Sequence, residues 1–442
     1  MNTWVKPKLG DINNVSRYSK SIQYLARAEQ TIPLGSQTFS KSRTQYPVGI
    51  SPHFIERAKG AYIWDLDGNR YIDLVNSLAS VTLGYGDSDI ENAVSKQLAL
   101  GVSFSLPGIL EAEVAELIVQ LVPCAEMVRF GKNGTDATSA AIRIARAYTG
   151  RDHVAVCGYH GWQDWYIGST TRDKGVPKAV SELTHKFLYN DIESLRSILQ
   201  AHPGEVAAVI MEPMNTQWPE PGFLEEVRKV TSMAGAVLIF DETITGFRFA
   251  KGGAQELFGV IPDLATFGKG MANGFPLSAV VGSRSIMMEM EEIFFSGTFG
   301  GELLSLAAAK IVLEKHLNED VSGRLTEIGS KLQERLNQVI VKNELASILE
   351  FSGHPSWVFL NWKPTQFYST DMIRTYFMQE MFQAGVLVLN SHNVSLAMDE
   401  KVLDDLLTRY ESVLFLIAKN IAENSLLDKL RVEPLAPLFR LR

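Results

Sequence analysis

Hydrophobic positions along the chain follow two patterns, short unbroken runs and helix-like spacings. The runs at residues 206–211 and 236–240 are apolar at every position, which is typical of parallel strands buried on both faces. From about residue 77 to residue 315, such runs alternate with segments whose apolar residues recur at helical intervals. This alternation predicts an α/β fold built on a mostly parallel sheet.

The two ends of the chain show a different pattern. Residues 62–74 alternate between apolar and polar positions around a central turn, which predicts a β-hairpin. Beyond a predicted helix at residues 321–341, strand and helix patterns follow one another to the last long helix. We therefore expect a large domain and a smaller α+β domain made from both ends of the chain. The expected segments are residues 1–75 (small domain), 76–325 (large domain) and 326–442 (small domain).

Composition narrows the classes of partner. The 442 residues carry 42 basic and 50 acidic side chains, a net charge of −8, which argues against binding to nucleic acid or anionic membranes. No apolar run approaches the roughly 20 residues of a membrane span, and the first residues lack the apolar core of a secretion signal. With only two cysteines, Cys124 and Cys157, the expected location is the reducing cytoplasm. The eight histidines show no His-x-x-x-His spacing, and no metal site is predicted.

One lysine follows a predicted strand into a glycine-rich turn. Lys269 comes after the apolar run at residues 264–267 and stands among Gly268, Gly270 and Gly274. Glycines let a bulky ring approach the backbone closely, and a lysine held partly out of water can become a nucleophilic amine. Such an amine is suited to a Schiff base with pyridoxal 5′-phosphate. The alternative is a surface lysine in a loop, which the motifs upstream disfavour.

Acidic side chains follow two of the predicted strands. Asp241 ends the run at residues 236–240, and Glu212 ends the run at residues 206–211. The carboxyl ends of parallel strands are where ligands bind in open α/β sheets. An aspartate paired with the pyridine nitrogen keeps pyridoxal phosphate protonated and able to accept electrons. A helix cap is the alternative role for Asp241, but two such acids favour a shared ligand crevice.

A strand, a glycine-bearing loop and a helix follow one another between residues 127 and 150. The start of this helix offers free N–H groups and the positive end of the helix dipole, which together suit an anion. Gly134 and Thr135 are therefore candidate phosphate ligands. The loop lacks the Gly-Lys-Ser/Thr ending of a P-loop, so a nucleoside triphosphate is not expected.

A second glycine-flanked turn carries an aromatic ring. Tyr159 and His160 stand between Gly158 and Gly161, directly after the apolar run that ends at Cys157. Tyr159 could stack on a cofactor ring, or be a half-buried tyrosine with its hydroxyl in water. For His160 a hydrogen-bonded structural role is the favoured interpretation.

In this order, these segments resemble the class III, fold-type I aminotransferases, and most closely glutamate-1-semialdehyde aminomutase and its aminotransferase relatives. The resemblance extends from about Leu34 to Ala308, and the stretches at residues 241–248 and 263–276 are its most specific parts. It implies a large domain that binds pyridoxal phosphate. Lys269 would form the Schiff base and later move protons, and Asp241 would hold the pyridinium. Tyr159 would stack on one face of the ring, and Thr243 would lie against the other.

The resemblance also implies contacts at the edges of the cofactor. Glu212 and Asn215 would line the side of the ring that carries the hydroxyl group. Gly134 and Thr135 would bind the phosphate, and Thr298 would reach the phosphate of the neighbouring subunit. The protein is therefore expected to be a homodimer.

Several substrate positions depart from the aminomutase pattern. Leu78 stands where the aminomutase has a tryptophan, and Thr38 or Ser40 corresponds only approximately to its serine. The mobile loop near Arg172 is shorter, and no acid stands near Asn393. The residues predicted to face the substrate are Thr38, Leu78, Trp162 and Arg172.

These departures decide between three hypotheses. An aminomutase must enclose its intermediate so that nitrogen returns to the same carbon skeleton. A shorter loop favours instead an aminotransferase that moves an amino group from a donor to an aldehyde or ketone. The alternatives are glutamate-1-semialdehyde 2,1-aminomutase and a non-catalytic binding protein, and the presence of both Lys269 and Asp241 argues against the latter.

Overall fold

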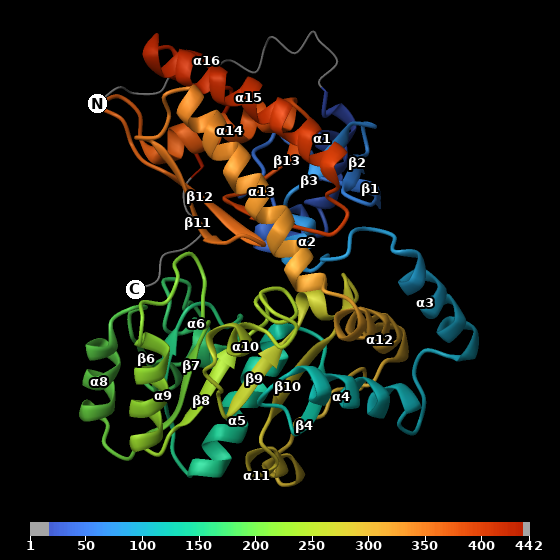
Figure 1. Ribbon diagram of the computed structural model, residues 1–442, viewed down its shortest axis with the longest axis vertical. Helices are drawn as coiled ribbons and strands as arrows, with labels where there is room; N and C mark the ends of the chain where they lie inside the picture. The colour runs from blue at the N-terminus through green and yellow to red at the C-terminus, as the bar shows by residue number, and fades with distance from the viewer. Residues whose placement is uncertain (1–16, 436–442) are drawn as a thin grey trace. The chain divides into compact units, whose positions relative to one another are not determined.

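The structure, a computed structural model, describes residues 17–435, which divide into two compact units (Figure 1). The first unit contains residues 17–75, 328–352 and 357–435. The second contains residues 76–327 and 353–356. Both ends of the described chain therefore belong to the first unit.

The second unit is built on a seven-stranded sheet in the order β4-β10-β9-β8-β7-β5-β6. The strands from β9 to β6 in this order are parallel, whereas β10 is antiparallel to both of its neighbours. The prediction of a mostly parallel sheet is thus confirmed, and β10 makes it a mixed one. The seven strands are β4 (Met127–Gly131), β5 (His153–Cys157), β6 (Thr184–Lys186), β7 (Val206–Met211), β8 (Val237–Asp241), β9 (Leu264–Phe267) and β10 (Ser278–Gly282).

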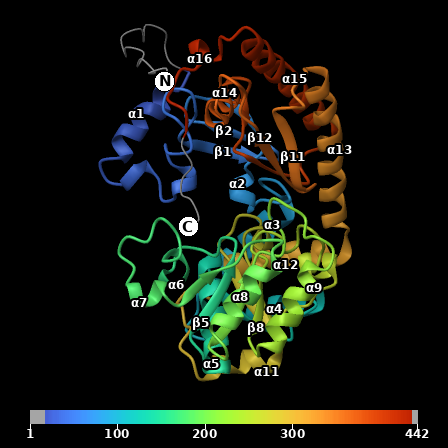
Figure 2. The same ribbon diagram turned by 90° about the vertical axis from the view of Figure 1, so that its left-hand side faces the viewer.

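Helices cover both faces of this sheet, and its central strands β7, β8 and β9 are buried at every position. In β7, Ala208 and Ile210 pack in a cluster with the apolar side of α5. Val209 and Met211, which point the other way, pack with α8 and α9, which lie in front of the sheet in Figure 2. The helical segments of this unit are α2 (Asn76–Ala79), α3 (Ser88–Leu100), α4 (Ile109–Leu121), α5 (Gly134–Thr149), α6 (Asp164–Ile167), α7 (Lys178–Ser181), α8 (Ile192–Ala201), α9 (Phe223–Met233), α10 (Ala254–Phe258), η3 (Lys269–Ala272), α11 (Arg284–Met287), η4 (Met288–Glu291) and α12 (Leu303–Asn318).

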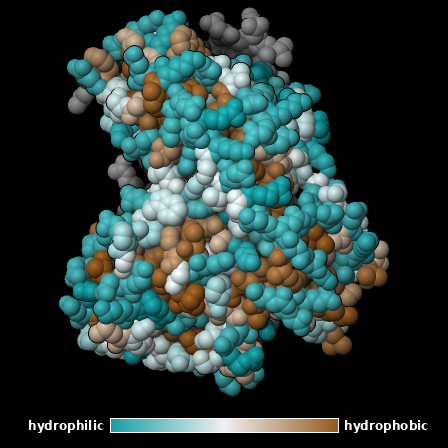
Figure 3. All heavy atoms as spheres, in the orientation of Figure 1, coloured by the Kyte–Doolittle hydropathy of each residue, from teal (hydrophilic) through white to brown (hydrophobic). Residues whose placement is uncertain are grey.

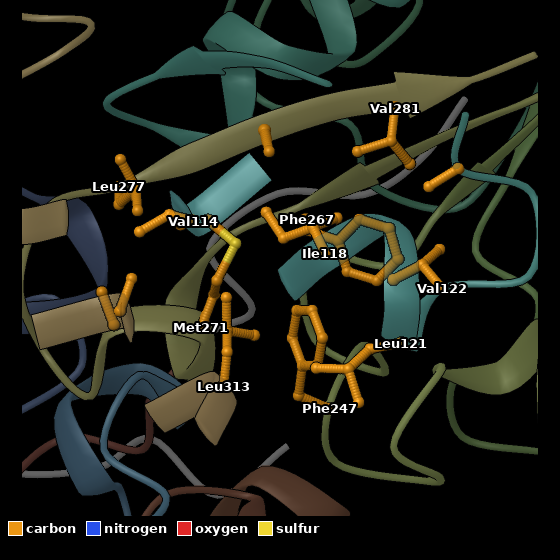
Figure 4. Close-up of a cluster of buried hydrophobic side chains, with 14 of the residues drawn as sticks. Val114, Ile118, Leu121, Val122, Phe247, Phe267, Met271, Leu277, Val281 and Leu313 are labelled. Atoms are coloured by element: carbon orange, nitrogen blue, oxygen red, sulfur yellow. The ribbon is translucent and has the colours of Figure 1, made fainter. Parts of the chain in front are cut away.

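A third cluster fixes the end of β9. Phe247 and Phe267 pack with ring centroids 5.1 Å apart, among side chains of α4 and α12 (Figure 4). Met271 joins the same cluster and is fully buried. Lys269 therefore stands between two buried anchors, each two residues away.

The first unit holds two small sheets, β1-β2-β3-β13 and β11-β12-β14. The predicted hairpin is confirmed, since β2 and β3 pair in antiparallel fashion. β13, from the C-terminal part, adds to β3 in parallel and pairs Val386 with Ile72. The elements are α1 (Ser19–Ala28), η1 (Pro33–Gly35), η2 (Phe39–Lys41), β1 (Ile55–Lys59), β2 (Tyr62–Asp65), β3 (Arg70–Asp73), most of α13 (Val321–Lys342) and of β11 (Leu349–His354), β12 (Trp357–Trp362), α14 (Thr370–Gln383), β13 (Val386–Leu387), β14 (Ser391–Asn393), α15 (Glu400–Ala422) and α16 (Leu426–Lys429).

The turn α2 has an unusual backbone. Asn76, Ser77, Leu78 and Ala79 have φ angles between 45° and 68°, so four residues in succession adopt the left-handed region without a glycine among them. Each such residue costs roughly 1–2 kcal/mol relative to the right-handed form. Strain of this kind persists only where the surroundings impose it, and it gathers at functional sites.

Among residues 17–435, no helix is both long enough and apolar enough to cross a membrane.

Candidate active site

Asp241, the last residue of β8, is only 5% exposed and lies in a dense network of donors. Its Oδ1 accepts hydrogen bonds from Thr243 N at 3.1 Å, Thr243 Oγ1 at 2.6 Å and Thr266 Oγ1 at 3.0 Å. Its Oδ2 lies 2.8 Å from His160 Nδ1. Burial alone would raise the pKa of Asp241, but the hydrogen bonds and charge of His160, aided by Thr243, lower it below its usual range. Asp241 is therefore a buried carboxylate that stays ionised.

His160 is held by two hydrogen-bond partners. Nε2 lies 3.1 Å from the carbonyl oxygen of Cys157, and Nδ1 lies 2.8 Å from Asp241 Oδ2. His160 thus forms a buried pair with Asp241. The structural role predicted from the sequence is correct in kind, but the partner, 81 residues away, was not predicted.

Lys269 follows β9 and opens the short helix η3. Its φ angle of 43° lies in the left-handed region, so the backbone itself is strained where the lysine enters the site. Burial lowers the pKa of Lys269 to about 8, the charges of Glu212 and Asp241 oppose this shift, and the charge of Arg248 adds to it. A sizeable share of the amine is therefore neutral near pH 7.

Arg248 is a fully buried cation of this region. Its guanidinium donates to the carbonyl oxygens of Ser356 at 2.9 Å and Ala79 at 3.4 Å, and burial lowers its pKa to about 10. The contact with Ala79 ties Arg248 to the left-handed turn α2. Sequence reasoning quoted Arg248 only as part of a motif and gave it no role.

Glu212 joins the Tyr159 turn to the end of β7. Its Oε2 accepts from Tyr159 N at 3.0 Å and from Asn215 Nδ2 at 2.9 Å. A Cβ atom at Gly158, where φ is 108°, would lie 2.5 Å from the same oxygen, so the close approach requires glycine. Burial, reinforced by the charge of Asp241, raises the pKa of Glu212. Tyr159 is 50% exposed, and its ring packs edge-on against Tyr166 with centroids 5.7 Å apart.

The start of α5 lies against the same group of residues. A Cβ atom at Gly134 would lie 2.9 Å from Thr243 Cγ2, so the helix start directly adjoins the residue that binds Asp241. Thr135 is buried, and its Oγ1 accepts from Trp162 N at 3.3 Å. A helix of 16 residues begins here, which supplies the N–H groups and dipole that an anion requires.

The predicted substrate residues are more dispersed. Trp162 is 64% exposed next to the Tyr159 turn. Arg172 lies in an exposed turn in which its N–H donates to Thr170 Oγ1 at 3.1 Å. Leu78 belongs to the left-handed turn α2. Thr38 belongs to the first unit, where its hydroxyl oxygen caps η2 by accepting from Lys41 N.

Thr298 lines a separate pocket of about 450 Å³ on the second unit. The pocket contains Lys132, Asp136 and Arg143 from the β4–α5 region, and the aromatic residues Phe295 and Phe299 from the segment of Thr298. Thr298 thus shares a surface hollow with the outer side of α5.

Comparisons with known proteins point in one direction. The family model for class III aminotransferases matches residues 45–405. The chain is 33% identical over 385 residues to 3-aminobutyryl-CoA aminotransferase of Cloacimonas acidaminovorans, covering 85% of this chain and 92% of that protein. It is 42% identical over 340 residues to glutamate-1-semialdehyde 2,1-aminomutase of Alkaliphilus oremlandii, covering 72% of this chain and 80% of that protein. The fold is similar to that of the FumI protein of Sphingopyxis sp. MTA144 in its PLP internal aldimine form, with a TM-score of 0.85 and 29% identity over 91% of this chain and 98% of that one.

Proposed function

Because this chain belongs to the class III aminotransferase family, an enzyme family that works with pyridoxal phosphate, we propose that it transfers an amino group from an amino donor to an aldehyde or ketone. The observation that carries this proposal is the presence, in one group of buried residues, of a lysine of lowered pKa, Lys269, and a carboxylate of lowered pKa, Asp241. Lys269 supplies an amine, and Asp241 supplies an anion.

The residues present fit the three functional groups of the cofactor. An amine at Lys269 suits its aldehyde, a buried anion at Asp241 suits its pyridine nitrogen, and the start of α5 at Gly134 and Thr135 suits its phosphate. When bound, pyridoxal phosphate accepts the electron pair that is left on the substrate carbon after a proton is removed. All other parts of the proposed mechanism belong to side chains of the chain.

In this proposal Lys269 Nζ moves the proton. A pKa of about 8 leaves the amine able to accept a proton from the donor carbon and to return it at a neighbouring atom, since a base works best with a pKa near the operating pH. The strained φ angle and the buried anchors Phe267 and Met271 hold the amine in a fixed direction. Fixed direction is what proton transfer between two neighbouring atoms requires.

Asp241 would hold a proton on the pyridine nitrogen of the bound cofactor, and His160 favours the ionised form of Asp241. The ion pair at 2.8 Å stabilises the carboxylate although burial disfavours it. Thr243 holds the other oxygen and places its methyl group against Gly134, which suits a residue beneath the ring. Tyr159 would cover the opposite face, and Glu212 with Asn215 would line the hydroxyl side.

We further propose a homodimer in which Thr298 completes the phosphate site of the partner. Apolar side chains are exposed between α3 and α4, among them Leu100, Leu106 and Ile109, and brown atoms lie on this side of the second unit in Figure 3. Leu303 N donates to the carbonyl oxygen of Val102 at 2.9 Å, so this apolar segment adjoins the segment of Thr298. Exposed apolar patches of this kind mark protein interfaces. A cytoplasmic location is proposed because both cysteines are free thiols, as is usual in a reducing compartment.

The aminomutase reaction is the second candidate, favoured by the 42% identity to an aminomutase. The two activities differ in their need for an acceptor. We expect glutamate-1-semialdehyde, given alone, to be converted poorly, because Leu78 replaces the aminomutase tryptophan and the loop at Arg172 is shorter. Steady-state formation of 5-aminolevulinate measures this, with Lys269→Ala as the inactive control. A kcat/KM above roughly 10⁴ M⁻¹s⁻¹ without an added acceptor would establish the aminomutase and exclude our proposal.

A further inference from the structure

Three histidines from separate parts of the second unit meet at the outer edge of its sheet. His153 begins β5, His185 lies in the neighbouring strand β6, and His202 follows the last turn of α8. His153 Nδ1 lies 2.7 Å from His185 Nε2. The rings stack on one another, with centroids 4.3 Å apart for His153 and His202 and for His185 and His202. One ring nitrogen of each histidine lies within 4.8 Å of the other two.

A carboxylate lies beside this group. Glu205 Oε2 lies 3.2 Å from His202 Nδ1 and 3.8 Å from His153 Nε2. Together with the three imidazoles it would supply four ligands, the number that zinc takes in its tetrahedral sites. Only one acid among these four residues is available to pair with three imidazoles. Ion pairs between Glu205 and the histidines therefore do not explain why all three rings lie together.

The group is separate from the proposed active site. β5 runs from His153 to Cys157 and leads into the Tyr159 turn. With a rise of about 3.3 Å per residue, the two ends of β5 are roughly 13 Å apart. The proposed site and the proposed active site therefore lie at opposite ends of the same strand.

The ligand atoms of this group suit zinc, which binds imidazole nitrogen and carboxylate oxygen. A neutral imidazole is the form that binds a metal ion. The two thiols are poor competitors, because Cys124 and Cys157 are both buried and burial raises the pKa of each to about 12.

We propose that His153, His185, His202 and Glu205 bind one divalent transition-metal ion of the zinc type. Zinc–nitrogen distances of 2.0–2.1 Å place tetrahedral ligands about 3.4 Å apart. Ring nitrogens that lie up to 4.8 Å apart must therefore close by at most about 1.4 Å, and His153 Nδ1 and His185 Nε2, at 2.7 Å, must separate by about 0.7 Å. The rings must also turn out of their stack, so that their in-plane lone pairs converge. The side chains of His153 and His202 are 21% and 26% exposed, which leaves room for this rotation.

The bound ion would act as a clamp. It would join β5, β6 and the segment between α8 and β7, which together form the outer edge of the sheet. A ligand that binds only the folded chain stabilises it, and the gain grows with the logarithm of the ligand concentration over its dissociation constant. The site would therefore act on stability and leave the transfer reaction unchanged.

Calorimetric titration of the cofactor-loaded, full-length protein with zinc chloride tests the proposal, using protein purified without a histidine tag and treated with a chelator. We expect one zinc ion per chain for the natural protein, and at least about tenfold weaker binding for His185→Gln and for Glu205→Gln. Glu193→Gln is the matched control, since it removes an exposed carboxylate of α8 that pairs with Arg196 outside the cluster. Equal zinc binding in His185→Gln and the natural protein would overturn the proposal, as would no binding to either.

X-ray absorption of the zinc-loaded natural protein supplies a test that depends on no variant. We expect three imidazoles and one oxygen at about 2.0–2.2 Å. A shell with fewer than three imidazoles would place the zinc elsewhere and refute the assignment. Magnesium, which prefers oxygen ligands, should neither bind this site nor raise the unfolding temperature as zinc does.

Discussion

The amine of Lys269 should titrate far below an ordinary lysine. Burial lowers its pKa from 10.5 to about 8. At pH 7, an amine with a pKa of about 8 is roughly 10% neutral, whereas an ordinary lysine is about 0.03% neutral. The folded chain should therefore offer roughly 300 times more free amine at this position than an unfolded chain does.

The charges around Lys269 determine how variants shift this titration. The carboxylate of Asp241 raises the pKa of Lys269, and the guanidinium of Arg248 lowers it. Asparagine has nearly the same shape as aspartate and lacks its charge, so Asp241→Asn should move the titration of Lys269 to lower pH. Arg248→Gln should move it to higher pH.

Trace acetylation of the cofactor-free protein measures the titration. The rate at Lys269, read from its peptide by mass spectrometry between about pH 6 and pH 11, should rise with a midpoint near 8. The same peptide in urea-unfolded protein is the control and should titrate near 10.5. A midpoint near 10.5 in the folded protein, or an upward shift in Asp241→Asn, would refute the reasoning.

Four further predictions concern the cofactor site. Gly134→Ala would bring a methyl group to 2.9 Å from Thr243 Cγ2; we expect weaker cofactor binding by equilibrium dialysis, partly restored by adding Thr243→Ser, and no loss would contradict the close contact. His160→Gln should lower the unfolding free energy by about 3 kcal/mol in urea because it leaves a buried carboxylate unpaired, whereas adding Asp241→Asn should recover part of this loss; additive losses would exclude the ion pair. Asp241→Asn alone should retain the cofactor but slow turnover by several orders of magnitude, and a rate within about tenfold of the natural enzyme would leave Asp241 a structural role only. Light scattering at nanomolar concentration should find a dimer, and a fully active monomer would remove the proposed role of Thr298.

The sheet of the large unit, and the positions of Asp241 and Lys269 at the ends of its strands, could be predicted because their signals are local. Each buried strand is an unbroken apolar run, and Asp241 and Lys269 follow such runs directly. The helix start at Gly134 is likewise contained within one short segment. These positions follow from the order of residues within short segments, and no long-range contact is needed to predict them.

What could not be predicted depends on residues that are distant in sequence. His160 pairs with Asp241, and Arg248 reaches the carbonyl oxygen of Ser356. The three clustered histidines are separated by 32 and 17 residues, which matches no metal-binding spacing. Only the folded sheet brings their strands together.

The left-handed turn α2 escaped prediction for another reason. Positive φ angles are normally signalled by glycine or asparagine, but Ser77, Leu78 and Ala79 give no such signal. Tertiary contacts such as the bond from Arg248 to Ala79 impose this conformation. The position predicted to contact the substrate, Leu78, thus has a backbone that its own sequence does not favour.

The parallel pairing of β3 with β13 has a consequence for biosynthesis. Ile72 pairs with Val386, so about 300 residues must be translated after β3 before its neighbour exists. At roughly 5–20 residues per second, this delay is on the order of 15–60 s. During it the hairpin of β2 and β3 presents an unpaired strand edge, the kind of surface that promotes aggregation. A ribosome that stops between residues 282 and 386 has already made every strand of the seven-stranded sheet. Its product lacks β13 and cannot complete the first unit. Such truncated chains should therefore bind chaperones while retaining much of the cofactor region.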